Sequence, residues 1–103
     1  MANVWMTWIS IKEEPKESEK ILTELGKKIK EDIDCGYNLE NNNRLFIQTR
    51  WEYHTVEDTL ADFSTNYPDY TCKVDSSGDV EDENGQLPDE KYHVKNGKGL
   101  KLS

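Results

Sequence analysis

The sequence predicts a single α+β domain in which the elements follow the order strand, helix, strand, strand, helix, strand. Three observations predict this class. Apolar residues alternate with period two in several short segments, recur at helical spacing in two longer ones, and are separated by Asn, Gly or Pro. The 103 residues fit one domain, because single domains commonly have roughly 100–150. We expect a core over residues 1–75, an acidic loop over 76–90 and a C-terminal strand or hairpin over 91–103.

The first expected strand covers residues 3–11 and is apolar or aromatic on both faces. Its alternating sets are Trp5, Ile9 and Ile11 on one face and Val4, Met6 and Trp8 on the other. A strand of this kind is typical of a sheet interior.

A helix is expected over residues 16–31, with the apolar stripe Ile21, Leu22, Leu25 and Ile29. Pro15 suits its first position, because proline lacks the N–H that would have no partner there. Gly26 weakens a helix by roughly 1 kcal/mol relative to Ala. We expect it to be a tolerated glycine rather than a site of close contact.

Residues 33–53 are expected to form a hairpin. Ile33, Cys35 and Tyr37 alternate in its first strand, and the Asn run at 41–43 tolerates the left-handed backbone of a turn. The second strand alternates along Leu45, Ile47, Thr49, Trp51 and Tyr53, with Phe46, Gln48, Arg50 and Glu52 on its other face.

A second helix is expected to begin at Thr55, whose hydroxyl can cap it, and Pro68 prevents its continuation. Alternation predicts a fourth strand over residues 70–75, a fifth over 91–95 and, after the Asn96-Gly97 turn, a return over 98–102. With right-handed crossover connections, this order of strands and helices forms a ferredoxin-like antiparallel sheet. The first strand is then central and both helices cover one face.

The segment Phe46-Ile47-Gln48-Thr49-Arg50-Trp51, followed by a helix and by Asn66-Tyr67-Pro68-Asp69-Tyr70, resembles the pattern of the YubB ferredoxin-like family. The resemblance covers residues 1–96 in element order. It implies a small protein of plasmids, phages and other mobile elements, and it supplies no catalytic residues. The region between the first helix and the Thr-x-Trp strand is shorter than is usual in that family, which puts a pocket built from that insertion in doubt.

The net charge of −8 comes from one segment. Residues 75–90 hold seven acids and no base, while the other 87 residues carry fourteen acids and thirteen bases. These acids are the candidate partner-binding residues: Asp75, Asp79, Glu81, Asp82, Glu83, Asp89 and Glu90. A negative field disfavours direct nucleic acid binding and favours a protein target with a basic surface.

The leading functional hypothesis is therefore a non-enzymatic acidic module of phage or plasmid type. Like an anti-CRISPR protein that mimics DNA, it would block a nucleic-acid-binding surface of a host protein with its carboxylates. The alternative is a structural or assembly protein that associates, as a homodimer or with a partner, through the helix-free sheet face. On that face either Val4, Met6 and Trp8 or the alternate set Trp5, Ile9 and Ile11 would be exposed unless the C-terminal hairpin or another chain covers them.

A third hypothesis, ranked after these two, is a module that binds a small ligand or RNA. Trp51, Arg50 and Tyr53 would form its stacking platform, but the chain is acidic as a whole. No catalytic motif accompanies His54 or His93, so we expect no enzyme. We expect no cofactor and no metal either, since an EF-hand frame from Asp75 places Val80 where glycine belongs.

Cys35 and Cys72 are not spaced as metal ligands, and reduced thiols indicate the cytoplasm. We expect no signal peptide and no membrane contact, because the N-terminal apolar residues alternate with polar ones and stop at Ile11.

Overall fold

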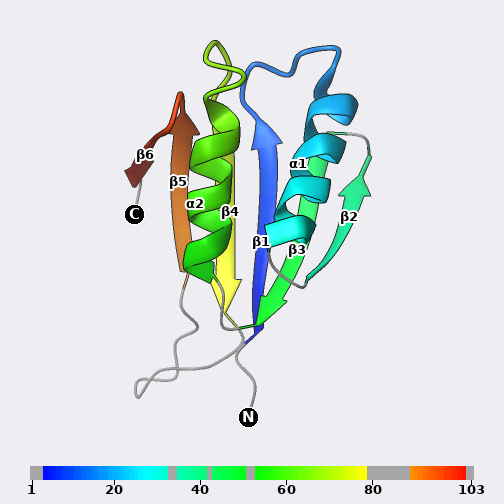
Figure 1. Ribbon diagram of the computed structural model, residues 1–103, viewed down its shortest axis with the longest axis vertical. Helices are drawn as coiled ribbons and strands as arrows, with labels where there is room; N and C mark the ends of the chain where they lie inside the picture. The colour runs from blue at the N-terminus through cyan, green and yellow to red at the C-terminus, as the bar shows by residue number, and fades with distance from the viewer. Residues whose placement is uncertain (1–3, 33–34, 42, 51–52, 79–88, 102–103) are drawn as a thin grey trace.

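The computed structural model describes residues 4–32, 35–41, 43–50, 53–78 and 89–101. These residues form an α+β structure with one six-stranded sheet and two helices (Figure 1). The elements are β1 Val4–Ile11, α1 Ser18–Asp32, β2 Gly36–Glu40, β3 Arg44–Arg50, α2 Tyr53–Ser64, β4 Cys72–Gly78, β5 Asp89–Lys95 and β6 Lys98–Lys101.

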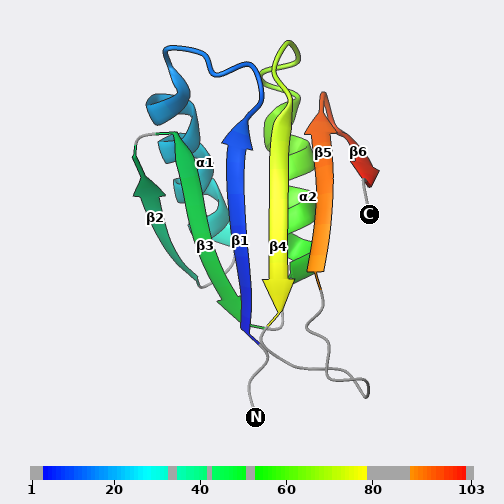
Figure 2. The same ribbon diagram turned by 180° about the vertical axis from the view of Figure 1, so that it is seen from behind.

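The strands lie in the order β2-β3-β1-β4-β5-β6, and each is antiparallel to its neighbours. β1 lies between β3 and β4, as expected of the first strand. Both helices cover the same face of the sheet, so the view from behind shows the strands in front of them (Figure 2). We call the side of the sheet away from the helices the open face.

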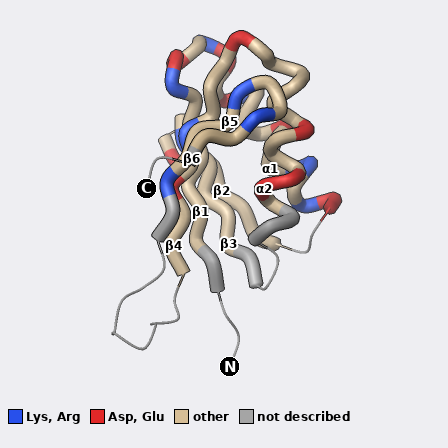
Figure 3. Tube along the Cα trace, turned by 90° about the vertical axis from the view of Figure 1, so that its left-hand side faces the viewer, with Lys and Arg blue, Asp and Glu red and all other residues tan. Residues whose placement is uncertain are grey.

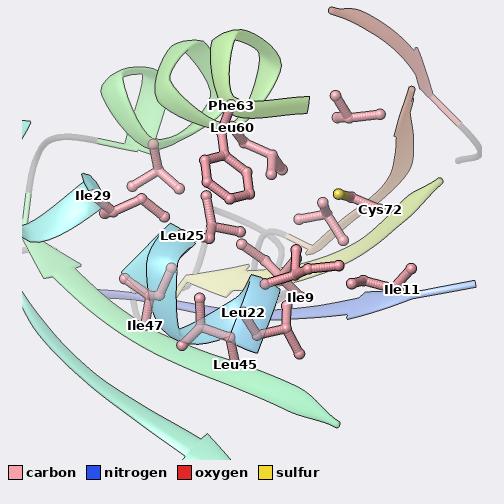
Figure 4. Close-up of a cluster of buried hydrophobic side chains, with 14 of the residues drawn as sticks. Ile9, Ile11, Leu22, Leu25, Ile29, Leu45, Ile47, Leu60, Phe63 and Cys72 are labelled. Atoms are coloured by element: carbon pink, nitrogen blue, oxygen red, sulfur yellow. The ribbon is translucent and has the colours of Figure 1, made fainter. Parts of the chain in front are cut away.

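The hydrophobic core lies between the helices and the sheet (Figure 4). The apolar stripe predicted for the first helix is buried, and Val56, Leu60 and Phe63 of α2 meet it. The sheet contributes Ile9, Ile11, Leu45, Ile47, Cys72, Val74, Tyr92 and Val94. Because strand side chains alternate between faces, the residues between these buried positions point to the open face.

The two hairpins predicted from Asn-rich turns are present. Asn41 has a φ of 53° between β2 and β3, and Asn96 and Gly97 have φ values of 48° and 80° between β5 and β6. Positive φ at both central residues is the signature of the two-residue turn that matches strand twist. The C-terminal hairpin continues the sheet at its edge and does not fold over the open face (Figure 2).

The first helix begins later than predicted. Pro15 is not its first residue, because the Ser18 N–H and hydroxyl both donate to the Pro15 carbonyl, at 3.1 and 2.7 Å. A turn therefore precedes the helix, which begins at Ser18.

The second helix begins earlier than predicted, at Tyr53 rather than Thr55, and β3 ends at Arg50. Tyr53 fits the strand alternation, but it also lies three residues before Val56 and seven before Leu60, at helical spacing. The expectation that Tyr53 belongs to the strand was wrong for this reason. Trp51, expected to end that strand, lies outside the described residues.

Strands β2 and β4 are both displaced toward the C-terminus from their predicted positions. β2 begins at Gly36, with the buried Cys35 just before it, and Ile33 is not among the described residues. β4 begins at Cys72, because Tyr70 lies in a turn in which its N–H donates to the Tyr67 carbonyl at 3.0 Å. β4 continues to Gly78, so residues 76–78 belong to the sheet.

Candidate binding site on the open face of the sheet

The structure places the predicted acidic site residues only in part. Asp79, Glu81, Asp82 and Glu83 lie outside the described residues. Asp89 and Glu90 begin β5, where they pair with Ser77 and Ser76. Asp75 is exposed on the open face, between Trp8 of β1 and Lys91 of β5 in the register. Among the predicted site residues, Asp75 is therefore the one whose surroundings can be described.

Aromatic side chains meet at the middle of the open face. Trp8 pairs with Phe46 of β3, and their rings lie 5.2 Å apart between centroids at an angle of 43°. Both are half-buried, whereas their neighbours Ile9, Leu45 and Ile47 point into the core. The row across the sheet continues from Trp8 to Asp75 and Lys91.

A second row of residues, two positions further along the strands, is basic. It runs from Arg44 in β3 past Ser10 to Lys73 in β4 and His93 in β5. A strand rises roughly 3.3 Å per residue, so this row lies about 7 Å from the aromatic row. Aromatic and cationic groups are thus neighbours on one surface.

The cations on this face differ in their partners. Arg44 is paired with Glu40 across the β2–β3 hairpin, with Nη2 2.9 Å and Nε 3.0 Å from the same carboxylate oxygen. The other ion pair between described residues joins Lys28 to Asp62 on the helical side. Among the side chains that the structure describes, which do not include those of Asp89 and Glu90, neither Lys73 nor Lys91 has a salt-bridge partner. Asp75 pairs with Lys91 in the register and lies two residues from Lys73 in β4.

Two adjoining depressions follow these rows. One, of about 330 Å³, is lined by Trp8, Arg44, Lys73, Asp75, Lys91 and His93, among others. The other, of about 370 Å³, is lined by Lys12, Glu14, Asn41 and Asn43 at the end of the sheet. They share Ser10, Arg44 and Lys73, so they form one surface feature, which we call the basic groove.

The charge of the basic groove is opposite to that of the chain. Its lining includes four basic side chains, Lys12, Arg44, Lys73 and Lys91, and two acidic ones, Glu14 and Asp75. The whole chain carries 13 basic and 21 acidic residues. Figure 3 shows Lys positions along β5 and β6, the last two strands at this edge of the sheet. An acidic protein therefore presents a locally basic surface.

The basic groove can hold an anion by its cations and a flat ring by the Trp8 side chain that lines it. The buried Cys72 faces the helices rather than the groove. Burial, with the charge of Glu13 as a smaller cause, raises the pKa of its thiol to about 11. A thiol with this pKa stays protonated near neutral pH and is unreactive.

The sequence indicated Trp8 as a candidate contact for association but not as part of a ligand site, and it did not single out Phe46 or Lys91. It placed a stacking platform at Trp51, Arg50 and Tyr53, but Tyr53 belongs to α2. Two signals were available. First, Trp8 and Phe46 each alternate with apolar residues that form the core, so their side chains point to the other face of the sheet. Second, every other residue of the fifth strand from position 91 is basic or His, so Lys91, His93 and Lys95 share one face.

No group of three or more His, Cys, Asp or Glu side chains suited to a metal ion occurs in the part of the chain that the structure describes. Within the same residues, neither helix has the length and apolar character needed to cross a membrane.

No family model, curated protein or solved structure matches the chain with significant similarity. The resemblance to the YubB ferredoxin-like family therefore stays a prediction.

Proposed function

We propose that this protein is a non-enzymatic binding module that takes a phosphate-bearing ligand in the basic groove on the open face of its sheet. The observation that carries the proposal is charge separation. Lys73 and Lys91 on the open face and Lys12 at the end of the sheet line one groove of a chain whose net charge is −8. Clustered cations raise the local concentration of an anionic ligand and speed its association.

The positive charge of the basic groove also disfavours a homodimer formed through the open face. Two open faces brought together would oppose like-charged grooves, which is unfavourable. The described apolar side chains of the open face in β1 and β3 are Met6, Trp8 and Phe46, and all three are half-buried already. This is little apolar surface for a stable homodimer, whose interfaces are more hydrophobic than most.

The proposal includes a finer description of the fold. β1 to β4 with α1 and α2 would be a ferredoxin-like core, and β5 and β6 would be additions at one edge. Support comes from the central position of β1, the antiparallel pairing and the placement of both helices on one face. It also includes a cytoplasmic location, which is consistent with the lack of a disulfide at the described cysteines Cys35 and Cys72.

Binding of inorganic polyphosphate, a chain of phosphates without bases, tests the proposal. At low salt we expect calorimetric titration to show binding to the wild-type protein and at least a tenfold loss for Lys73→Gln/Lys91→Gln. The matched control is Lys27→Gln/Lys30→Gln, which removes two exposed lysines from α1 and should bind like the wild type. No binding by the wild type, or an equal loss in the control, would overturn the proposal.

A second candidate function uses the acidic residues. The seven acids and no base over residues 75–90 favour a surface that blocks a basic protein target. Replacing Asp79, Glu81, Asp82 and Glu83 by their amides and recovering partners from a host lysate tests it. The candidate fails if the same basic protein is captured by both forms with the same salt dependence.

A further inference from the structure

We infer that the ligand of the basic groove is a single-stranded nucleic acid, with its bases stacked on Trp8 and Phe46 and its phosphates on the Lys and Arg side chains that line the groove. This inference rests on the proposed function and names the class of its ligand. It departs from the expectation of no nucleic acid binding, which considered the charge of the whole chain rather than of one face.

The aromatic row supplies the stacking surface. Trp8 and Phe46 lie 5.2 Å apart, on adjacent central strands, and Trp8 lines the depression. Rigid strands hold the two rings in place, so little side-chain freedom is lost on binding. Stacking of bases on aromatic side chains is tolerant of sequence and gives much of the affinity for single strands. In a duplex the base faces are already stacked on one another and cannot reach the sheet.

The spacing of the two rows fits a nucleotide. The aromatic row and the row of Arg44, Lys73 and His93 are separated by two residues along the strands, which is about 7 Å. A base and its own phosphate lie at a comparable separation in an extended chain. The groove then leads past Lys73 to Lys12 at the end of the sheet, so successive phosphates meet successive cations.

Asp75 gives the site a base preference. It is exposed and pairs with Trp8 in the register, so a base stacked on Trp8 presents its edge toward this carboxylate. Carboxylates accept hydrogen bonds from the exocyclic amino group of cytosine, whereas uracil has a carbonyl oxygen at that position. The site should therefore prefer cytosine to uracil, and Asp75→Asn, whose amide can both donate and accept, should lose the preference.

Fluorescence polarisation with three labelled probes of equal length tests the inference: oligocytidylate, oligouridylate and an abasic strand with the same phosphates. We expect the wild type to bind oligocytidylate at least tenfold more tightly than the abasic strand. Trp8→Leu and Phe46→Leu keep an apolar side chain without a ring. They should lower oligocytidylate affinity toward that of the abasic strand and leave abasic binding unchanged. Circular dichroism confirms that both variants are folded.

The outcomes separate the inference from the proposed function. If the wild type binds the abasic strand and polyphosphate as tightly as oligocytidylate, the groove binds phosphate chains and the nucleic acid inference is overturned. If none of the probes binds, the proposed function fails as well. Equal affinity for oligocytidylate and oligouridylate would remove the role assigned to Asp75. Loss of abasic binding in Trp8→Leu and Phe46→Leu would also count against stacking.

Discussion

The ring of Tyr37 in β2 packs directly against Gly26 in α1. A Cβ atom at residue 26 would lie 2.7 Å from Cδ2 and 2.9 Å from Cε2 of that ring, closer than non-bonded carbon atoms approach. The expectation of a merely tolerated glycine was therefore wrong. Gly26 allows α1 to approach β2, the edge strand of the sheet.

Gly26→Ala should destabilise the protein even though alanine favours helix formation. The gain in helix propensity is roughly 1 kcal/mol, and overpacking typically costs roughly 1–3 kcal/mol. We expect a net loss of roughly 1 kcal/mol in the free energy of unfolding, measured by urea denaturation.

The double variant Gly26→Ala/Tyr37→Ala isolates the cause. Once the ring is removed, the same Gly26→Ala change should become stabilising, by up to roughly 1 kcal/mol. Destabilisation of equal size in both backgrounds would show that the ring contact is not the reason for glycine at this position.

A buried pair of hydroxyl groups joins β1 to β4. The Thr7 and Ser76 oxygens are 2.9 Å apart, and both residues are fully buried. Ser76→Ala or Thr7→Val alone leaves one buried hydroxyl without this partner and should cost roughly 1–3 kcal/mol. Thr7→Val/Ser76→Ala should cost less than the sum of the single changes. Strictly additive losses in urea denaturation would contradict this coupling.

Glu13 joins the segment after β1 to the start of β4. Its carboxylate accepts bonds from the Thr71 N–H at 2.7 Å and the Thr71 hydroxyl at 3.0 Å. Partial burial would raise the pKa of Glu13, but these bonds, together with a hydrogen bond to the Glu13 backbone and the charge of Lys95, outweigh it, and the pKa is lowered from its usual value of 4.5. The stability that Glu13 contributes is therefore present above pH 4.5 and is lost as pH falls through the lower folded-state pKa.

Glu13→Gln should accordingly destabilise the protein slightly at pH 7, by less than about 1 kcal/mol because the site is exposed. The difference from the wild type should shrink below pH 4. Urea denaturation at several pH values measures it, with Glu14→Gln as the control. A difference that is constant with pH would show that the carboxylate charge is not involved.

The buried thiol of Cys72 should be protected from modification. With a pKa raised to about 11, roughly one thiol in a thousand is ionised at pH 8. A thiol-reactive dye should label Cys72 at pH 8 only on the timescale of unfolding, and mild urea should accelerate it. Complete labelling of Cys72 within seconds under native conditions, located by peptide mapping, would contradict the burial.

The elements that the sequence predicted correctly depend on local signals. Asn96 and Gly97 adopt the positive φ values that their turn requires, and the stripe containing Leu22 and Leu25 is buried as its spacing indicates. Tyr53 was misassigned because one residue can satisfy both a two-residue and a 3.6-residue period. Only the tertiary arrangement decides which period applies.

The candidate site could not be predicted in the same way, because it depends on strand order. Trp8, Lys73 and Lys91 are distant in sequence, and they become neighbours only when β4 pairs with both β1 and β5. The charge of the whole chain conceals this local basic surface. Once the register is known, the alternation of Lys91 with the buried Tyr92 places it on the open face.

The salt dependence of oligocytidylate binding tests the central claim most directly. Three or four phosphate contacts, from Lys12, Lys73, Lys91 and Arg44, predict a slope of roughly −2 to −3 for the logarithm of the affinity against the logarithm of salt concentration. Lys73→Gln and Lys91→Gln should each make this slope less negative by roughly 0.7, and Lys27→Gln should not change it. A slope near zero, or one that Lys27→Gln changes as much as Lys73→Gln, would contradict the basic groove as the binding site.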